Sequence, residues 1–182
     1  WLDRIQSNKV LNTEARYAVR TALDLGGYFA GGFARTLIVT LLAERRGTST
    51  FEAFGSWDRM FNYVSIRRTP RAQDEGHRLW KADVGDLDCF FPDRSSADEC
   101  VQRFLLGPPG SCKWNAKTLA GFGHEFVMGN SLMQVIQRVN GTPSEVLDGF
   151  DLANAKVYVV KFGIHWTDEW AELEKTQRLG LD

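Results

Sequence analysis

The sequence has few cysteines and almost no net charge, and each shortage excludes a class of protein. Three cysteines stand among 182 residues, an odd number without CxxC spacing. This argues against a disulfide framework and a cysteine zinc site, and it favours a reducing compartment. A net charge of −1 gives no global basic field to hold a long nucleic acid nonspecifically.

Long apolar runs are also missing. The longest mostly apolar run, 37–43, is far too short to cross a bilayer, and no signal peptide is visible. We therefore expect an intracellular protein without a membrane partner. Hydrophobic residues make up 43% of the chain and charged residues 25%, as in ordinary globular proteins. A chain of this length is expected to form a single domain, 1–182, with a real core.

The N-terminal part of the chain predicts two helices with a short strand between them. Apolar residues at helical spacing predict the helices over about 12–25 and 33–46, and the strand covers 28–30. Gly31 and Gly32 stand between the strand and the second helix. Glycines there allow a close backbone approach, and the free N–H groups of a helix start attract anions. A tight turn that needs glycine is the alternative explanation.

Residues 86–91 predict a short strand that carries two carboxylates. Because side chains alternate along a strand, Asp86 and Asp88 point to one face, and Leu87 and Cys89 can point to a core on the other. Two ionised carboxylates this close repel each other, which favours a bound cation such as Mg²⁺. Two solvated acids at a strand end are the alternative.

The rest of the chain predicts an insert, a helix, several strands and two more helices. The insert covers about 48–84, and its basic stretch at 66–71 either faces phosphates or is a solvated surface. After residue 91 we expect a helix that is capped by Ser95 or Ser96 and ends near Leu106. Strands are expected at 125–128 and 132–139, followed by a helix that starts at Thr142 and Pro143. A long strand at 150–160 and a helix over 167–179, capped by Thr167, complete the chain. This order suits an α+β fold with a mixed, mostly antiparallel sheet and flanking helices.

Asp151 stands at the start of the expected strand at 150–160, on a face of small apolar residues, where a carboxylate needs a partner. Asp148 is a near competitor for the same role, and Asp151 is preferred because Phe-Asp-Leu begins the strand. His124 and His165 are more typical of local hydrogen bonding than of catalysis. The tryptophans at 114, 166 and 170 are more typical of packing than of stacking on a base.

The combination of a strand–Gly-Gly–helix unit, an Asp-x-Asp strand and a later acid resembles the polymerase-β-like nucleotidyltransferase superfamily. The matching stretches are Ala-Gly-Gly-Phe-Ala-Arg at 30–35, Gly-Asp-Leu-Asp-Cys-Phe-Phe at 85–91 and Phe-Asp-Leu at 150–152. Residues 132–158 are also similar to small nucleotidyltransferase-like proteins of phages and large viruses, in which a strand with glutamine, a Gly-Thr-Pro helix start and Phe-Asp-Leu follow one another. Here these are Met-Gln-Val-Ile at 133–136, Gly-Thr-Pro at 141–143 and Phe-Asp-Leu at 150–152. The resemblance covers about 28–46 and 84–160. Phe33 stands where the family often has serine, and the gap between Gly-Gly and Asp-x-Asp is longer than usual.

This resemblance implies a metal-dependent nucleotidyltransferase with a core like the palm of polymerase β. Asp86, Asp88 and Asp151 would hold Mg²⁺ or Mn²⁺, and Asp151 would also help to activate the attacking hydroxyl. Two metal ions can stabilise the attacking and the leaving oxygens of such a transfer, which explains why several carboxylates are needed.

The same resemblance implies that Gly31 and Gly32 grip a nucleoside triphosphate through their N–H groups and that Arg35 contacts a phosphate. A surface charge is the alternative for Arg35. The acceptor is an RNA, a protein or a small molecule, and the insert would be a substrate lid or a surface for a protein partner. The rival functions are a catalytically silent structural or interaction module of a phage or viral assembly, and a hydrolase with similar carboxylates. The presence of all three acids favours activity.

Overall fold

The computed structural model describes residues 13–35, 37–38, 87–110, 113–128, 131–151 and 153–175. Its elements in chain order are α2 (Thr13–Asp24), β1 (Tyr28–Ala30), helical residues at 32–35 and 37–38, β2 (Leu87–Phe91), α6 (Arg94–Leu106), β3 (Asn115–Leu119), β4 (Gly123–Met128), β5 (Ser131–Asn140), α7 (Pro143–Asp148), the 3-10 helix η3 (Ala153–Ala155), β6 (Val157–Val160), β7 (Gly163–Trp166) and α8 (Asp168–Lys175).

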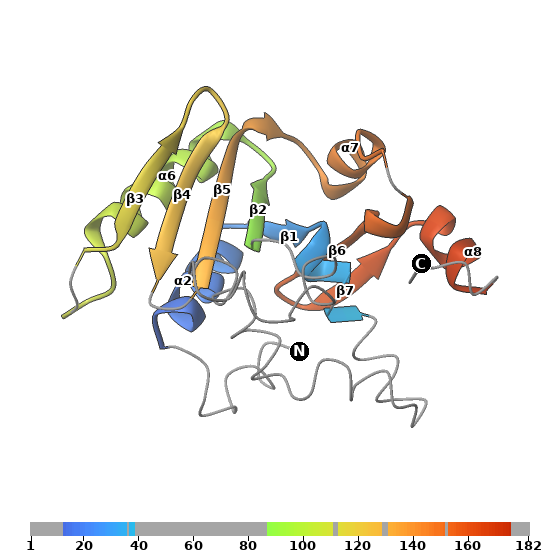
Figure 1. Cartoon of the computed structure of the whole chain (residues 1–182), viewed down its shortest axis with the longest axis horizontal. Helices are drawn as coiled ribbons and strands as arrows, with labels where there is room; N and C mark the ends of the chain where they lie inside the picture. The colour runs from blue at the N-terminus through green and yellow to red at the C-terminus, as the bar shows by residue number, and fades with distance from the viewer. Residues whose placement is uncertain are drawn as a thin grey trace, which may run out of the picture.

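The strands form one sheet in the order β3-β4-β5-β2-β1-β6-β7 (Figure 1). β2 and β5 run parallel, and the other neighbouring strands of this sheet run antiparallel. The predicted α+β class, with a mixed, mostly antiparallel sheet and flanking helices, is therefore confirmed.

One face of the sheet is covered by α2 and α6; we call it the α2/α6 face. Figure 1 shows α6 behind β3, β4 and β5. Leu87, Cys89 and Phe91 of β2 are fully buried there, in a core that also holds Val19 of α2 and Phe104 of α6. The predicted alternation along β2 is thus confirmed for the described residues.

The other face carries α7, and we call it the α7 face. A second, smaller cluster forms there from Tyr28, Ala30, Phe90, Ile136, Val146 and Leu147. α7 has the predicted start, with Pro143 in its first turn and a capping box in which the Thr142 and Glu145 side chains each bond the backbone of the other. This cap fixes the point at which α7 begins, and hence where its apolar residues meet the sheet.

The cap predicted for α6 is wrong. Asp93 caps the helix: its Oδ1 accepts from the Ser96 backbone N–H at 2.8 Å and its Oδ2 accepts from the Ser96 hydroxyl at 3.0 Å. Asp93 has an extended backbone and the helix begins at Arg94, so both predicted serines lie inside the first turn. The cap predicted for α8 is confirmed, because the Trp170 backbone N–H donates to Thr167 Oγ1 at 3.3 Å.

The long strand predicted over 150–160 is also wrong. The chain turns through η3, where the Lys156 backbone N–H donates to the Ala153 carbonyl at 3.1 Å, and β6 begins only at Val157. Ala-Asn-Ala lacks the β-branched side chains that favour a strand. Two edge strands, β3 and β7, were not predicted.

Several predictions fall outside the described residues. These are the helix beyond residue 38, the insert at 48–84 with its basic stretch, and the end of the C-terminal helix. Within the described ranges, no helix has the length and apolar character needed to cross a membrane.

Candidate active site

Three residues with oxygen-bearing side chains stand side by side on adjacent strands of the α7 face. The strand register pairs Asp88 of β2 with Gln134 of β5, and Gln134 with Glu125 of β4. Residues paired in this way project to the same face of a sheet. The three side chains therefore form a short line, which we call the acceptor row.

The same register continues on the other side of β2. Tyr28 pairs with Phe90 and Phe29 with Cys89, so Ala30 is the next residue toward Asp88 along β1. Ala30 pairs in turn with Tyr158 of β6. In the line of paired residues across the three strands, the small Ala30 therefore stands between Asp88 and Tyr158.

Asp88 lies against the glycine turn that ends β1. A Cβ placed on Gly31 would lie 3.7 Å from Oδ2 of Asp88. Gly31 has φ +77°, in the left-handed region that glycine adopts without steric cost. The helix starts at Gly32, and the Arg35 backbone N–H donates to the Gly31 carbonyl at 2.9 Å. The predicted strand–Gly-Gly–helix unit is confirmed, and its first glycine, Gly31, lies next to the Asp88 carboxylate.

Asp151 does not occupy the strand position predicted for it. The Phe150 backbone N–H donates to the Leu147 carbonyl at 3.0 Å, so the chain leaves α7 in a turn, and Asp151 stands exposed before η3. Its neighbour Phe150 does reach the site: Cε2 would lie 3.9 Å from a Cβ on Gly31, and the ring centroid lies 6.1 Å from that of Phe90. The loop that carries Asp151 thus passes beside the glycine turn.

Asp86 lies outside the described residues, so the Asp86, Asp88 and Asp151 triad stays a prediction. Among the described residues, no group of three or more His, Cys, Asp or Glu side chains could hold a metal ion. The acceptor row nevertheless offers oxygen atoms, which are the ligands that Mg²⁺ and other hard divalent cations prefer. The donor chemistry of these residues therefore fits such a cation, with Asp88 as the anionic ligand nearest the glycine turn.

The strand register places Gln134 beside Asp88 and Glu125 beside Gln134, and neither residue was a predicted site residue. Glu125 is only 6% exposed, and its Oε2 accepts from Gln134 Nε2 at 3.3 Å. Burying a carboxylate is costly unless it is hydrogen-bonded. The bond from Gln134 therefore offsets part of the cost of burying Glu125. The available signal was alternation along the two predicted strands, but it does not say which residues of different strands pair.

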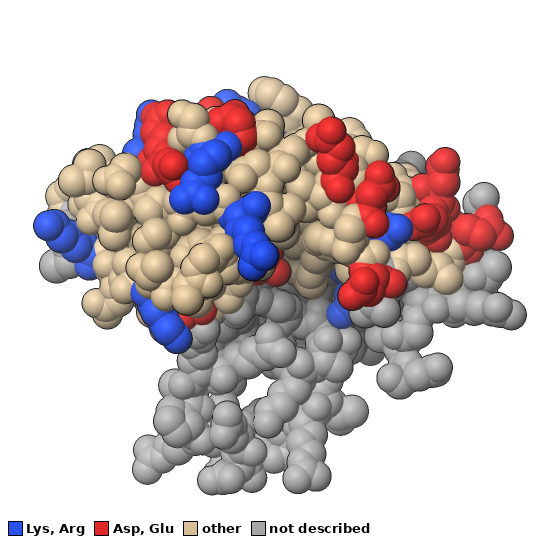
Figure 2. Space-filling model, turned by 90° about the horizontal axis from the view of Figure 1, so that it is seen from above, with Lys and Arg blue, Asp and Glu red and all other residues tan. Residues whose placement is uncertain are grey.

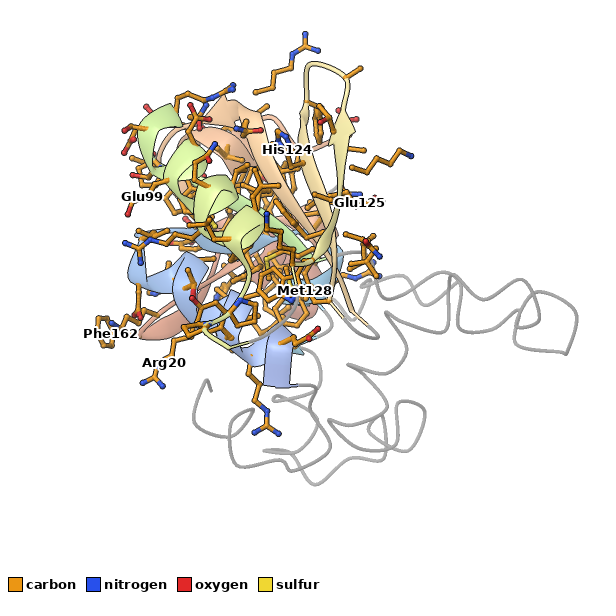
Figure 3. All side chains as sticks on the ribbon, turned by 90° about the vertical axis from the view of Figure 1, so that its left-hand side faces the viewer. Arg20, Glu99, His124, Glu125, Met128 and Phe162 are labelled. Atoms are coloured by element: carbon orange, nitrogen blue, oxygen red, sulfur yellow. The ribbon has the colours of Figure 1, made fainter. Side chains whose placement is uncertain are left out.

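His124 lies on the α2/α6 side of β4, and Glu125 lies on the other side (Figure 3). His124 Nδ1 lies 2.6 Å from Gln137 Oε1, and Gln137 Nε2 donates to Asp98 of α6 at 2.5 Å. This is the local hydrogen bonding expected of His124. His165 stacks on Tyr158, with centroids 5.0 Å apart.

The buried tyrosine and thiols nearby are held in their neutral forms. Burial raises the pKa of Tyr28, whose hydroxyl donates to the Gly141 carbonyl at 3.0 Å and ties β1 to the start of α7. Burial also raises the pKa of Cys89 and of Cys100. Neither thiol is therefore activated as a nucleophile.

Charged side chains of both signs lie on the surface that Figure 2 shows, and acidic ones gather toward the end formed by α7 and α8. The first turns of these helices contain Glu145, Asp168 and Glu169. The described side chains at this end therefore do not favour an anionic ligand by charge, whereas the backbone N–H groups of a helix start do.

No protein-family model matches the chain, and no curated protein or solved structure matches it. The assignment of function therefore depends on the chemistry of the site.

Proposed function

We propose that the protein is a metal-dependent nucleotidyltransferase, which moves a nucleoside monophosphate from a nucleoside triphosphate to a hydroxyl acceptor. The observation that carries this proposal is the approach of Asp88 to the glycine turn, with Oδ2 3.7 Å from a Cβ position on Gly31. A carboxylate that can hold a cation thereby adjoins a helix start whose N–H groups can bind phosphate.

Each residue has a role in this proposal. Asp88, together with Asp86 two positions earlier on the chain, holds Mg²⁺ or Mn²⁺, which when bound stabilises charge on the reacting oxygens. Gly31 and Gly32 donate backbone hydrogen bonds to the triphosphate. Arg35 stands within the first turn of the helix that begins at Gly32, where its guanidinium can reach a phosphate.

Asp151 is proposed as the residue that meets the acceptor. It is exposed, in the loop next to Phe150, so it can accept a proton from an incoming hydroxyl without disturbing the sheet. An RNA, a protein and a small molecule all offer such a hydroxyl, and the insert at 48–84 is proposed to select among them.

The test is Asp88→Asn, which keeps the shape of the side chain and removes its charge. Transfer of labelled nucleotide with Mn²⁺ should fall by at least about 100-fold, the scale of losing one preorganised electrostatic contact, while the thermal unfolding midpoint stays close to that of the parent. Asp98→Asn, on α6 across the sheet, is the matched control and should retain transfer.

Equal transfer by the parent and Asp88→Asn would refute the proposal. Nucleotide binding without any transfer by the parent would instead support the silent structural or interaction module. Steady release of free nucleoside monophosphate into water would support the hydrolase.

A further inference from the structure

We propose that Thr118 is a second reactive centre of this protein: its hydroxyl is a nucleophile that takes an acyl group from an activated ester, with His124 as the general base. Gln137 is the positioning residue that holds the His124 ring. The inference goes beyond the proposed transferase, because this reaction uses neither a nucleotide nor a cation.

The hairpin of β3 and β4 brings the hydroxyl and the imidazole together. The strand register pairs Thr118 with His124, so both side chains project to the α2/α6 face. Thr118 Oγ1 lies 3.4 Å from His124 Nε2, and such distances are often long in a free protein and shorten when substrate is bound. Thr118 is exposed on an edge strand, so an ester can approach its hydroxyl from solvent.

The His124 ring is held by packing and by a buried partner (Figure 3). It stacks on the fully buried Phe126, with centroids 6.2 Å apart and planes 25° apart. Its Nδ1 lies 2.6 Å from Oε1 of Gln137, a residue that is only 7% exposed. A nucleophile, a base and a group that orients the base therefore follow one another, which is the general arrangement of an activated hydroxyl.

The partners of Gln137 fix which nitrogen of His124 carries the proton. Asp98 Oδ1 accepts from Arg94 Nε at 2.7 Å, and an arginine can only donate, so this oxygen is an acceptor. Gln137 turns its amide nitrogen to the same oxygen at 2.5 Å, which leaves the amide oxygen facing His124. An amide oxygen only accepts, so Nδ1 carries the proton, and in the neutral ring Nε2 has the lone pair that faces Thr118.

The chemistry of these groups favours acyl transfer over phosphoryl transfer. A hydroxyl beside a neutral imidazole is the pair that acyl transfer uses, whereas phosphoryl transfer relies on cations to balance the phosphate charge. The charged groups next to Gln137 are Arg94 and Asp98, and they form an ion pair with each other at 2.7 Å. An uncharged ester is therefore the matching substrate.

The step balances without a further reactant. The Thr118 oxygen bonds to the carbonyl carbon of the ester, and its proton moves to Nε2 of His124. The bond from that carbon to the leaving oxygen then breaks, and the leaving oxygen takes the proton from Nε2. The products are an O-acyl threonine and an alcohol, and His124 is neutral again.

The experiment treats the full chain with p-nitrophenyl acetate and locates acetyl groups by mass spectrometry of its peptides. The parent should be acetylated at Thr118. Ser95, an exposed hydroxyl in the first turn of α6, has no histidine partner in the described part of the chain and should stay unmodified. Ser95→Ala is the matched control variant, and its Thr118 should be acetylated at the rate of the parent.

Substitutions at the pair test the two roles. Thr118→Val keeps the β-branched shape and should lose the fast release of p-nitrophenolate, whereas Thr118→Ser should retain it. His124→Phe keeps a ring that can stack on Phe126, and acetylation of Thr118 should slow by at least about 100-fold, the scale of a lost general base. Thermal unfolding checks that each variant is folded, and His124→Gln provides the same test with a polar side chain.

Two substitutions at Gln137 separate positioning from a structural role. Gln137→Met removes the acceptor for Nδ1, so acetylation of Thr118 should slow by at least about 10-fold as the ring loses its fixed tautomer. Gln137→Glu restores an acceptor oxygen and should recover most of the parent's rate. A purely structural role predicts the opposite order, because a carboxylate at this position is repelled by Asp98 and a methionine is not.

The inference is overturned if Thr118 is acetylated no faster than Ser95, or if the His124 variants acetylate Thr118 within about twofold of the parent, well short of the loss expected for a general base. If Gln137→Glu is as slow as Gln137→Met or slower, the positioning role of Gln137 is wrong. The proposed transferase is tested separately, with nucleotide, so neither result bears on it.

Discussion

Alternate residues of β2 point to two faces of the sheet, and the described residues form a larger hydrophobic cluster on one face than on the other. Leu87, Cys89 and Phe91 are fully buried under α2 and α6, whereas Asp88 is half-buried on the α7 face. α2 and α6 contain 12 and 13 residues and α7 only 6. The acceptor row lies on the same face of the sheet as this short helix. A polar site on the α7 face therefore does not interrupt the larger hydrophobic core on the α2/α6 face.

The largest expected effect tests whether the α2/α6 face supplies most of the stability. Phe104 is fully buried, with ring centroids 5.1 Å from Trp114 and 5.2 Å from Phe126. Phe104→Ala should lower the free energy of unfolding by about 3–5 kcal/mol, because it leaves a cavity that cannot collapse. Denaturant unfolding provides the measurement.

Phe150→Ala makes the same change on the α7 face. Phe150 is half-buried, so the expected loss is about 1 kcal/mol, a fraction of the value for a fully buried side chain. Equal losses for the two variants would show that the faces do not differ in the way described.

Two glycines beside β1 sharpen the comparison, because they are required for different reasons. A Cβ on Gly27 would lie 2.7 Å from the Ala22 carbonyl oxygen and 2.8 Å from Cε1 of Phe91. Gly27→Ala should therefore cost about 1–3 kcal/mol through overpacking of the α2/α6 face. Thermal unfolding of Gly27→Ala and of Gly27→Ser should show a loss in both, since each adds a Cβ.

At Gly31 the space is adequate and the backbone is the constraint. The nearest atoms to an added Cβ lie 3.7 and 3.9 Å away, and φ is +77°. Gly31→Ala should cost about 1–2 kcal/mol, the usual penalty of the left-handed region, and Gly31→Asn should cost less because asparagine visits that region more readily. If Asn and Ala at this position are equally destabilising, the backbone explanation is wrong.

The fold was predictable where local sequence decides the structure. The periodicity of α2 and α6, the alternation in β2 and the Thr-Pro start of α7 each act over a few residues, and all are found in the structure. The strand expected from residue 150 failed because the turn that ends α7 and the η3 turn replace it. β3 was missed because it is an edge strand of mostly exposed residues and so lacks an apolar alternation.

The candidate site was predictable only in part, for a related reason. The side on which Asp88 projects follows from alternation within one strand, and the glycine turn follows from two adjacent residues. The neighbours of Asp88 follow instead from the parallel pairing of β2 with β5, which joins segments far apart in the chain. The position of Gln134 beside Asp88, and of Glu125 beside Gln134, could not be found without that register.

The smallest expected effect compares the helix starts of the two faces under acid. The pKa of Asp93, at the start of α6, is held below its usual range by hydrogen bonds from Ser96, and the pKa of Glu145, in the first turn of α7, is lowered by hydrogen bonds from Thr142. A carboxyl whose pKa is lower in the folded state stabilises the protein above its unfolded pKa. That stability is lost as the pH falls through the folded pKa, so both caps should weaken in acid.

Asp93→Asn should keep stability at neutral pH nearly unchanged, because asparagine also caps helices well, and should make the loss of stability in acid shallower. Glu145→Gln should do the same for α7. Urea midpoints measured between about pH 2 and pH 7 test both variants across the titration of the carboxyls. The main core lies under α6, so global unfolding should report Asp93 more strongly than Glu145; a larger change for Glu145→Gln would mean that α7 contributes more to the cooperative unit than its size suggests.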